Sequence, residues 1–205
     1  MRSVTLRLFG LVAIVCSNRC LWAEVLTYDN LAVSANGSAT VSLNGYGGLG
    51  ESNLAYLDGT QIGVGYANGV VSPNNVAYDP GGTPSELLAM TGTFSLFSAY
   101  FTAAWRDGMQ ITVDGYVGAQ LVDSQQFIVN TTGPVFETFD FIGITEALIS
   151  TSGGTIHSGY NLQDTNGEQF VMDNLNVTTP EPGALALATV GAVGVSLAAR
   201  RRRAV

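Results

Sequence analysis

The 205-residue sequence contains no lysine, one histidine and only two cysteines. With His157 as the sole histidine, a site built from several imidazole ligands is excluded. Both cysteines, Cys16 and Cys20, lie in the leader described below. Once that leader is removed, the mature chain has no thiol, so it can form neither a disulfide nor a cysteine metal site.

Positive charge is almost absent from the middle of the chain. From Glu24 to Thr179 the only cation is Arg106. Of the 16 acidic residues of the chain, all except Glu181 lie in this segment, which leaves fifteen against one arginine and a net charge near −14. Such a surface repels phosphate backbones and anionic lipid head groups, so we expect no nucleic-acid partner. The commoner role of an acidic surface is to keep a protein soluble.

The N-terminus has the three parts of a secretory signal peptide. Arg2 and Arg7 form a basic start, residues 8–16 form a short apolar run, and Ala23 ends a cleavage site. The alternative is a short buried core segment, but nine apolar residues behind a basic start suit a signal peptide better. We therefore predict a signal peptide over residues 1–23 and an exported mature chain.

Residues 24–178 are typical of an all-β body. Asn-Gly and Asp-Gly pairs, which favour the tight turns of β-hairpins, divide this body. The pairs begin at Asn36, Asn44, Asp58, Asn68, Asp107, Asp114 and Asn166. Between them lie short runs rich in β-branched and aromatic residues, and no helical stripe is evident. The runs are SATVSL (38–43), QIGVGY (61–66), TFSLFSAYFTAAW (93–105), MQITVDGYVG (109–118), SQQFIVN (124–130) and EQFVMDNLNV (168–177). We predict an antiparallel, jelly-roll-like β-sandwich.

One motif occurs near both ends of the body. DNLAV (29–33) returns as DNLNV (173–177). We interpret the two copies as the first and last strands, lying side by side in one sheet; a duplicated domain is the alternative. Adjacent strands would bring Asp29 and Asp173 together, and neighbouring carboxylates either share a cation or raise a pKa. A shared Ca²⁺ is therefore the one cofactor that the sequence allows. The simpler alternative is that each Asp caps its own strand end and binds no ion.

Residues for catalysis do not gather in any recognised pattern. GYGGLG (45–50) matches a dinucleotide fingerprint by letter, but no helical segment follows it, so we interpret it as a tight loop. His157 lacks a Gly-x-Ser-x-Gly elbow for a triad, and we expect an exposed loop histidine. Glu137, Asp140 and Glu146 are the densest carboxylates, and they carry the alternative of a glycoside hydrolase. Since Glu137 and Asp140 are three residues apart, a regular strand points them to opposite faces. We expect no enzyme.

Aromatic residues near glycine are candidates for stacking on sugar rings. The alternative places most of them in the core or at its rim. They are Tyr46, Tyr56, Tyr66, Tyr78, Tyr116 and Tyr160, together with Trp105.

The chain ends in a proline-flanked acid, an uncharged segment and a cluster of arginines. Pro180, Glu181 and Pro182 precede the uncharged residues 183–199, which would form a helix about 25 Å long, near the lower limit for a membrane span. Because this segment is rich in alanine and glycine, its insertion is only weakly favourable. The cluster would hold the tail on the cytoplasmic side and leave the body outside. It consists of Arg200, Arg201, Arg202 and Arg203.

This tail resembles the PEP-CTERM sorting signal, also labelled ice-binding protein C-terminal domain. The resemblance covers residues 179–203 with all three parts in order. It implies processing by an exosortase, a membrane-embedded transpeptidase-like cysteine protease of Gram-negative-type bacteria, with Pro180, Glu181 and Pro182 as recognition residues. It also implies that the body is released or joined to an extracellular polysaccharide matrix. The body is similar, more loosely, to the β-sandwich domains common in that family, which implies a fold and little activity.

These features predict an acidic β-sandwich protein, processed by signal peptidase and an exosortase. The C-terminal helix would hold it transiently in the inner membrane. It would then act at the cell surface or in the polysaccharide matrix as a structural or carbohydrate-contacting component. Two alternatives remain, a secreted glycoside hydrolase using Asp/Glu pairs and a surface protein permanently anchored by its tail.

Overall fold

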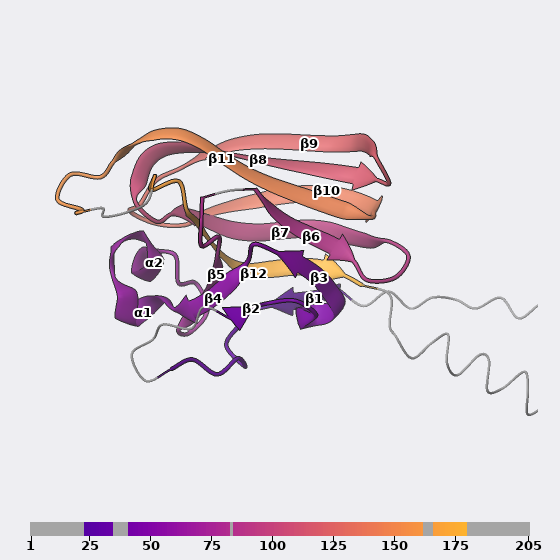
Figure 1. Ribbon diagram of the computed structural model, residues 1–205, viewed down its shortest axis with the longest axis horizontal. Coiled ribbons are helices and arrows are strands. Elements are labelled where there is room, and N and C mark those ends of the chain that lie inside the picture. The colour runs from indigo at the N-terminus through magenta and orange to yellow at the C-terminus, as the bar shows by residue number, and fades with distance from the viewer. Residues whose placement is uncertain (1–22, 35–40, 83, 162–165, 180–205) are drawn as a thin grey trace, which may run out of the picture.

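A computed structural model describes residues 23–34, 41–82, 84–161 and 166–179 (Figure 1). The predicted leader up to Trp22 lies outside these residues. So do Pro180, Glu181 and Pro182, the predicted helix 183–199 and the arginines at 200–203. Within the described residues, no helix has the length and apolar character to cross a bilayer.

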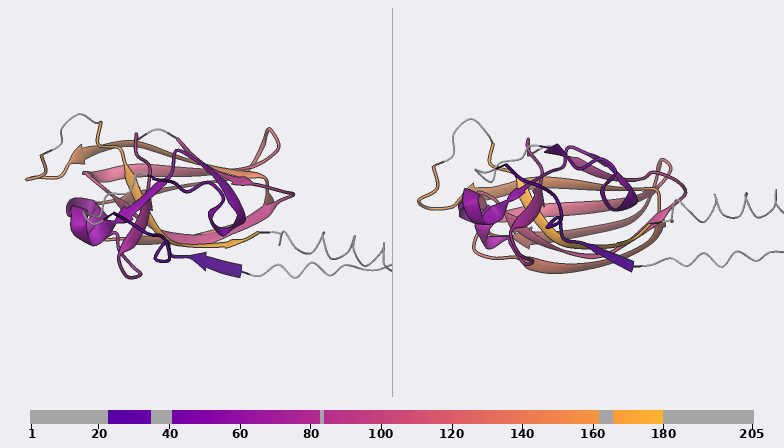
Figure 2. Two further views of the ribbon diagram at one scale, coloured as in Figure 1. Left: turned by 60° about the horizontal axis from the view of Figure 1, so that its bottom comes forward. Right: turned by 90° about the horizontal axis from the view of Figure 1, so that it is seen from below.

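The described chain forms two antiparallel sheets that pack face to face (Figures 1 and 2). Sheet A has the order β10-β7-β12-β5-β4-β2, and β1 also pairs with β12. Its strands are β1 (Ala23–Leu26), β2 (Val41–Ser42), β4 (Ala55–Asp58), β5 (Asn75–Tyr78), β7 (Phe94–Ala103), β10 (Val135–Ile144) and β12 (Phe170–Thr178). Sheet B has the order β3-β6-β11-β8-β9. Its strands are β3 (Leu49–Ser52), β6 (Ser85–Ala89), β8 (Arg106–Val117), β9 (Gln120–Val129) and β11 (Glu146–Ile156). The prediction of an antiparallel sandwich is confirmed.

The core lies between the sheets and is rich in aromatic rings. Phe101 of β7 is buried, and its ring lies 5.2 Å from that of Phe127 in β9 and 5.8 Å from that of Phe170 in β12. The rings therefore join the two sheets. Burying each such side chain contributes about 1.5–3 kcal/mol, so the alternation of apolar residues along these strands fixes which faces meet.

The first and last strands are neighbours, but the first DNL motif is not part of the first strand. β1 pairs antiparallel with β12, with Ala23 opposite Thr178. Residues 29–33 instead form a turn after β1. Tyr28 has a φ of 64° and its carbonyl accepts a hydrogen bond from the Leu31 amide, so the chain reverses there. The prediction that residues 29–33 form a strand is wrong, because a buried tyrosine in left-handed conformation ends β1.

The run QIGVGY (61–66) is helical, contrary to our expectation of a strand. It lies in two short helices, α1 (Gly59–Ile62) and α2 (Val64–Asn68). The Asp58 carboxylate accepts a hydrogen bond from the Thr60 amide and so caps α1. Gly65 lets α2 lie directly on the end of β7, because a Cβ atom there would overlap the carbonyl oxygen of Ala103.

The Asp-Gly pairs also behave differently from the prediction. Asp107-Gly108 and Asp114-Gly115 both lie within β8, and the β8–β9 hairpin turns instead around Gly118. Gly115 is closely packed, since a Cβ atom there would lie 3.0 Å from the Phe141 ring. The GYGGLG segment does form the tight loop that we predicted: a 3-10 turn, η1 (Tyr46–Gly48), leads directly into β3.

Candidate functional site

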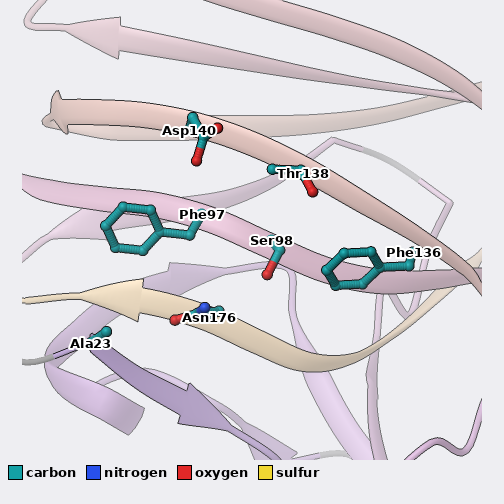
Figure 3. A pocket seen from close by; sticks show the side chains of 7 residues that line it. All are labelled: Ala23, Phe97, Ser98, Phe136, Thr138, Asp140 and Asn176. Atoms are coloured by element: carbon teal, nitrogen blue, oxygen red, sulfur yellow. The ribbon is translucent and has the colours of Figure 1, made fainter.

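A shallow groove of about 420 Å³ lies on the outer face of sheet A (Figure 3). We call it the sheet-A groove. It crosses four strands, β10, β7, β12 and β1. It is lined by Ala23, Phe97, Ser98, Phe136, Thr138, Asp140 and Asn176.

Two β-bulges flank β7 at the level of this groove. In β10, Thr138 is opposite Ser98 but Phe141 is opposite Leu96, so β10 contains one extra residue. In β12, the step from Asp173 to Asn176 likewise matches only two steps along β7. A bulge bends its strand and increases the local twist. Two of them on either side of β7 hollow the outer face of the sheet where the groove lies.

The groove combines aromatic rings with neutral polar groups and one carboxylate, that of Asp140. The Phe136 side chain is 53% exposed, and its ring lies 4.9 Å from that of Tyr100. Ser98, Thr138 and Asn176 supply hydroxyl and amide groups beside the rings (Figure 3). The Oδ1 atom of Asn176 is buried and has no hydrogen-bond partner within the described residues. Apolar rings beside a few polar groups are the usual lining of a small-ligand site.

Asp29 and Asp173 do not bond to each other; Asp173 binds the loop before β5, and Asp29 binds the first residue of β5. Asp173 is buried, and its Oδ2 accepts hydrogen bonds from the amides of Val71 and Ser72 at 2.7 and 2.9 Å. Asp29 Oδ1 accepts one from the Asn75 amide at 3.1 Å. Burial raises the pKa of Asp173, although these amides act in the opposite direction. Within the described residues, no group of three or more His, Cys, Asp or Glu side chains gathers as a metal site.

His157 is half-buried and paired, which differs from the exposed loop histidine that we expected. Its Nδ1 lies 2.6 Å from Asp107 Oδ2 and 3.0 Å from Thr131 Oγ1. The Thr131 hydroxyl also donates to Asp107 Oδ1. In a catalytic triad, the hydroxyl and the carboxylate contact different ring nitrogens. Here both contact Nδ1, so the three residues do not form a triad. They link the start of β8 to the segments that follow β9 and β11.

The densest carboxylates do not flank a common site. Glu137 Oε2 accepts a hydrogen bond from Gln125 Nε2 of sheet B at 2.8 Å. Asp140 lines the sheet-A groove on the other face of β10. Glu146 lies at the start of β11 in sheet B.

Most of the candidate aromatic residues pack against one another. Tyr56, Tyr66 and Tyr78 are buried. Trp105 stacks edge-on with Tyr66 and Tyr160, at 6.1 and 6.2 Å. Tyr46 is half-buried, its hydroxyl donating to Asn30 at 2.7 Å, and Tyr116 is half-buried in β8.

Sequence reasoning missed the ring pair on the outer face, Phe136 and Tyr100. A signal existed: along β10, Phe136, Thr138, Asp140 and Ile142 alternate with Phe139 and Phe141, which are buried. Alternation of this kind separates an outer face from a core face. The exposed ring on that outer face is the one that a ligand can reach.

Two buried acids were also missed. Glu51 of β3 and Asp79 after β5 are 6% and 0% exposed. Burial raises the pKa of each to about 8. Neither Glu51 carboxyl oxygen has a partner within the described residues, and Asp79 Oδ2 has none. These carboxyl groups are therefore largely protonated at neutral pH.

The molecule is an all-β sandwich with a groove on one outer face. Residues 178–203 match the PEP-CTERM protein-sorting motif, so the chain carries the sorting motif that its tail resembles. That motif implies export and sorting to the cell surface, with processing by an exosortase.

Several solved structures are distantly similar in shape. The K2 cleaved adhesin domain of Lys-gingipain is 12% identical, with 77% of this chain and 99% of that chain covered and a TM-score of 0.43. A DUF4465 family protein from Bacteroides ovatus is 10% identical, with coverage of 78% and 99% and a TM-score of 0.44. TmCBM61 in complex with β-1,4-galactotriose is 9% identical, with coverage of 71% and 99% and a TM-score of 0.39. These similarities are too distant to bear on function. No curated protein matches the chain significantly.

Proposed function

We propose that this chain is an exported, non-catalytic surface protein, delivered by an exosortase to the cell surface or the extracellular polysaccharide matrix. In this proposal the jelly-roll-like body contacts a carbohydrate chain through the sheet-A groove. Signal peptidase cuts after Ala23. The helix 183–199 holds the precursor in the inner membrane until Pro180, Glu181 and Pro182 are recognised.

The proposal of a carbohydrate contact rests on one observation. An exposed aromatic ring lies beside neutral polar groups in an open groove. Sugar rings have apolar C–H faces and hydroxyl edges. Phe136 offers an apolar face, while Thr138, Ser98 and Asn176 offer hydrogen-bonding groups within the same groove. A shallow groove also suits a chain that runs across a sheet better than a small molecule that must be enclosed.

The sorting part is tested by the intact mass of the protein recovered from its native cell surface or medium. We expect a species that begins at Glu24 and ends near Thr179, with any excess mass reporting attached matrix. A species that still carries Arg200 to Arg203 would show a permanent anchor and would overturn the sorting proposal.

The binding part is tested with matched substitutions in the mature protein. Phe136→Ala should weaken retention on the neutral polysaccharide of the producing cell by about tenfold, which corresponds to about 1.4 kcal/mol. Ile128→Ala is the control, because Ile128 is 52% exposed but belongs to sheet B. Equal effects of the two substitutions would exclude the groove, and release of reducing sugar by the wild type would favour the hydrolase alternative.

A further inference from the structure

Several turns meet at the end of the sandwich where β1 begins and β12 ends. Thr178 of β12 is opposite Ser95, which follows the β6–β7 turn at residues 90–93. Phe94 is in turn opposite Ile144, where β10 ends. Figure 1 shows the start of β1 and the ends of β12 and β10 on one side of the molecule. We call this side the tail end, because the sorting motif starts there.

Sheet B contributes to the same end. Glu146 of β11 is opposite Tyr116, at the end of β8, and opposite Leu88, at the end of β6. The Gly118 amide in the β8–β9 turn donates to Thr145 Oγ1 at 2.8 Å. The tail end therefore consists of the β6–β7, β8–β9 and β10–β11 turns together with η1.

The tail end exposes large apolar side chains. Met90 is 61% exposed and Ile142 is 64% exposed. Val25, Val117, Leu121 and Val122 are also exposed there. Exposed apolar side chains that gather on one face mark an interaction surface.

The turns at the tail end carry no charge, although the body as a whole is strongly acidic. No charged residue occurs within 43–50, 89–94, 116–122 or 141–145. The nearest acids, Glu24, Asp123 and Glu146, lie on the strands just behind these turns. At the opposite end lie further acids, namely Asp58 and Asp107 at strand ends and Glu168 just before β12. Negative charge is thus kept away from the tips of the tail end.

In the proposed function, the segment 183–199 would enter the membrane only a few residues beyond the tail end. The Thr179 hydroxyl donates to the Gly47 carbonyl at 3.2 Å, so the described body reaches to Thr179. Four extended residues from Thr179 to Gly183 span at most about 14 Å. That length is comparable with the Debye length of about 10 Å at 0.1 M salt, so acids at these turns would be repelled by anionic head groups.

We propose that the tail end lies against the phospholipid bilayer while the precursor is tethered, with Met90, Ile142 and Val117 in the interfacial region. Burial of these side chains favours contact, and the lack of charge on the turns reduces the repulsion. In this orientation the tail end contacts the membrane, and the opposite, more acidic end of the body faces away from it. This inference rests on the proposed function, since it requires the segment 183–199 to enter the bilayer.

The test uses the full chain in vesicles of phosphatidylethanolamine and phosphatidylglycerol. Cys16→Ser and Cys20→Ser give a background without thiols. Met90→Cys and, as a matched control at the opposite end, Thr60→Cys each carry an environment-sensitive fluorophore; Thr60 is likewise exposed. We expect a blue shift and quenching by lipid-attached quenchers at position 90, and neither at position 60.

The outcomes separate the two proposals. If the chain floats with the vesicles but both labels report water, the tail end does not touch lipid and this inference fails alone. If the chain does not float, the tethering in the proposed function fails, and this inference fails with it. A blue shift at position 90 without vesicles, with a doubled mass by light scattering, would assign the surface to a second copy of the chain.

Discussion

Glu51 places a carboxyl group inside the sandwich, where burial raises its pKa from 4.5 to about 8. The nearby Tyr28 hydroxyl is also buried without a hydrogen-bond partner within the described residues. The folded protein therefore retains a proton that the unfolded chain releases above pH 4.5. Stability from this group is fully present below pH 4.5, is lost as the pH rises to about 8, and then levels off.

We predict that Glu51→Gln makes the protein less sensitive to alkaline conditions. Each such group lowers the free energy of unfolding by about 1.4 kcal/mol per pH unit within its window. Asp79 titrates in the same window, from 3.8 to about 8, and burial also raises the pKa of Asp173, so the substitution should remove at most about half of the wild-type slope. Chemical denaturation between pH 5 and 8 measures this. The same change at exposed Glu24 is the control, and an unaltered slope in Glu51→Gln would contradict the buried proton.

Asp173 fastens the loop between α2 and β5. We predict that Asp173→Ala lowers the free energy of unfolding by about 1–3 kcal/mol, because the Val71 and Ser72 amides lose their acceptor. Asp29→Ala should cost less, since Asp29 accepts a hydrogen bond from one amide, that of the first residue of β5. Thermal unfolding with and without calcium distinguishes this role from ion binding. A calcium-dependent rise in melting temperature, absent from Asp173→Ala, would instead support a shared cation.

At the scale of elements, α2 lies against β7 through a glycine. We predict that Gly65→Ala destabilises the protein by at least about 1–3 kcal/mol, because its Cβ would overlap the backbone of Ala103 and Ala104. Gly133→Ala should be nearly neutral, since no atom lies within 4 Å of a Cβ at that position. Comparison of the two melting temperatures checks this, and equal values would mean that α2 moves away without cost.

The strands could be predicted from the sequence where apolar, aromatic and β-branched residues form a long run, as in β7, β9 and β12. Shorter sequence patterns gave wrong predictions of strands and turns. Residues 61–66 alternate like a strand, but Gly65 allows a helix to pack closely on β7. Asp114-Gly115 looks like a hairpin turn, yet its glycine makes room for the Phe141 ring across the core. In both cases the deciding contact comes from a strand distant in sequence.

The groove was harder to predict than the strands, because it depends on contacts between strands that are distant in sequence. The sequence indicates that Phe136 and Asp140 share a face of β10, but not which strands lie beside it. The groove lies where the bulges in β10 and β12 both adjoin Ser98 of β7. A bulge is set by strand pairing, so it leaves little trace in composition or periodicity.

At the scale of the whole molecule, self-repulsion of negative charge opposes folding. We predict that the melting temperature rises when NaCl increases from about 0.01 to 0.1 M, as the Debye length falls from about 30 to about 10 Å. Arg106 forms the only ion pair between fully charged side chains within the described residues, at 3.8 Å from Glu168. The salt effect should shrink near pH 4, where many carboxylates are neutral. A salt-independent melting temperature at pH 7 would show that the charges are too well separated to matter.

The pairing of Glu24 with Val177 brings the two ends of the mature body together. A chain whose two ends are hydrogen-bonded neighbours can be joined by a short linker and reopened elsewhere, for instance at the Gly118-Ala119 turn, without altering its sheets. It can equally be inserted as a cassette into another protein, or exchange one tail for another. The proposed sorting signal is a separate C-terminal segment. Recombination could therefore replace that segment, and so change where the protein is delivered, while the body keeps its fold.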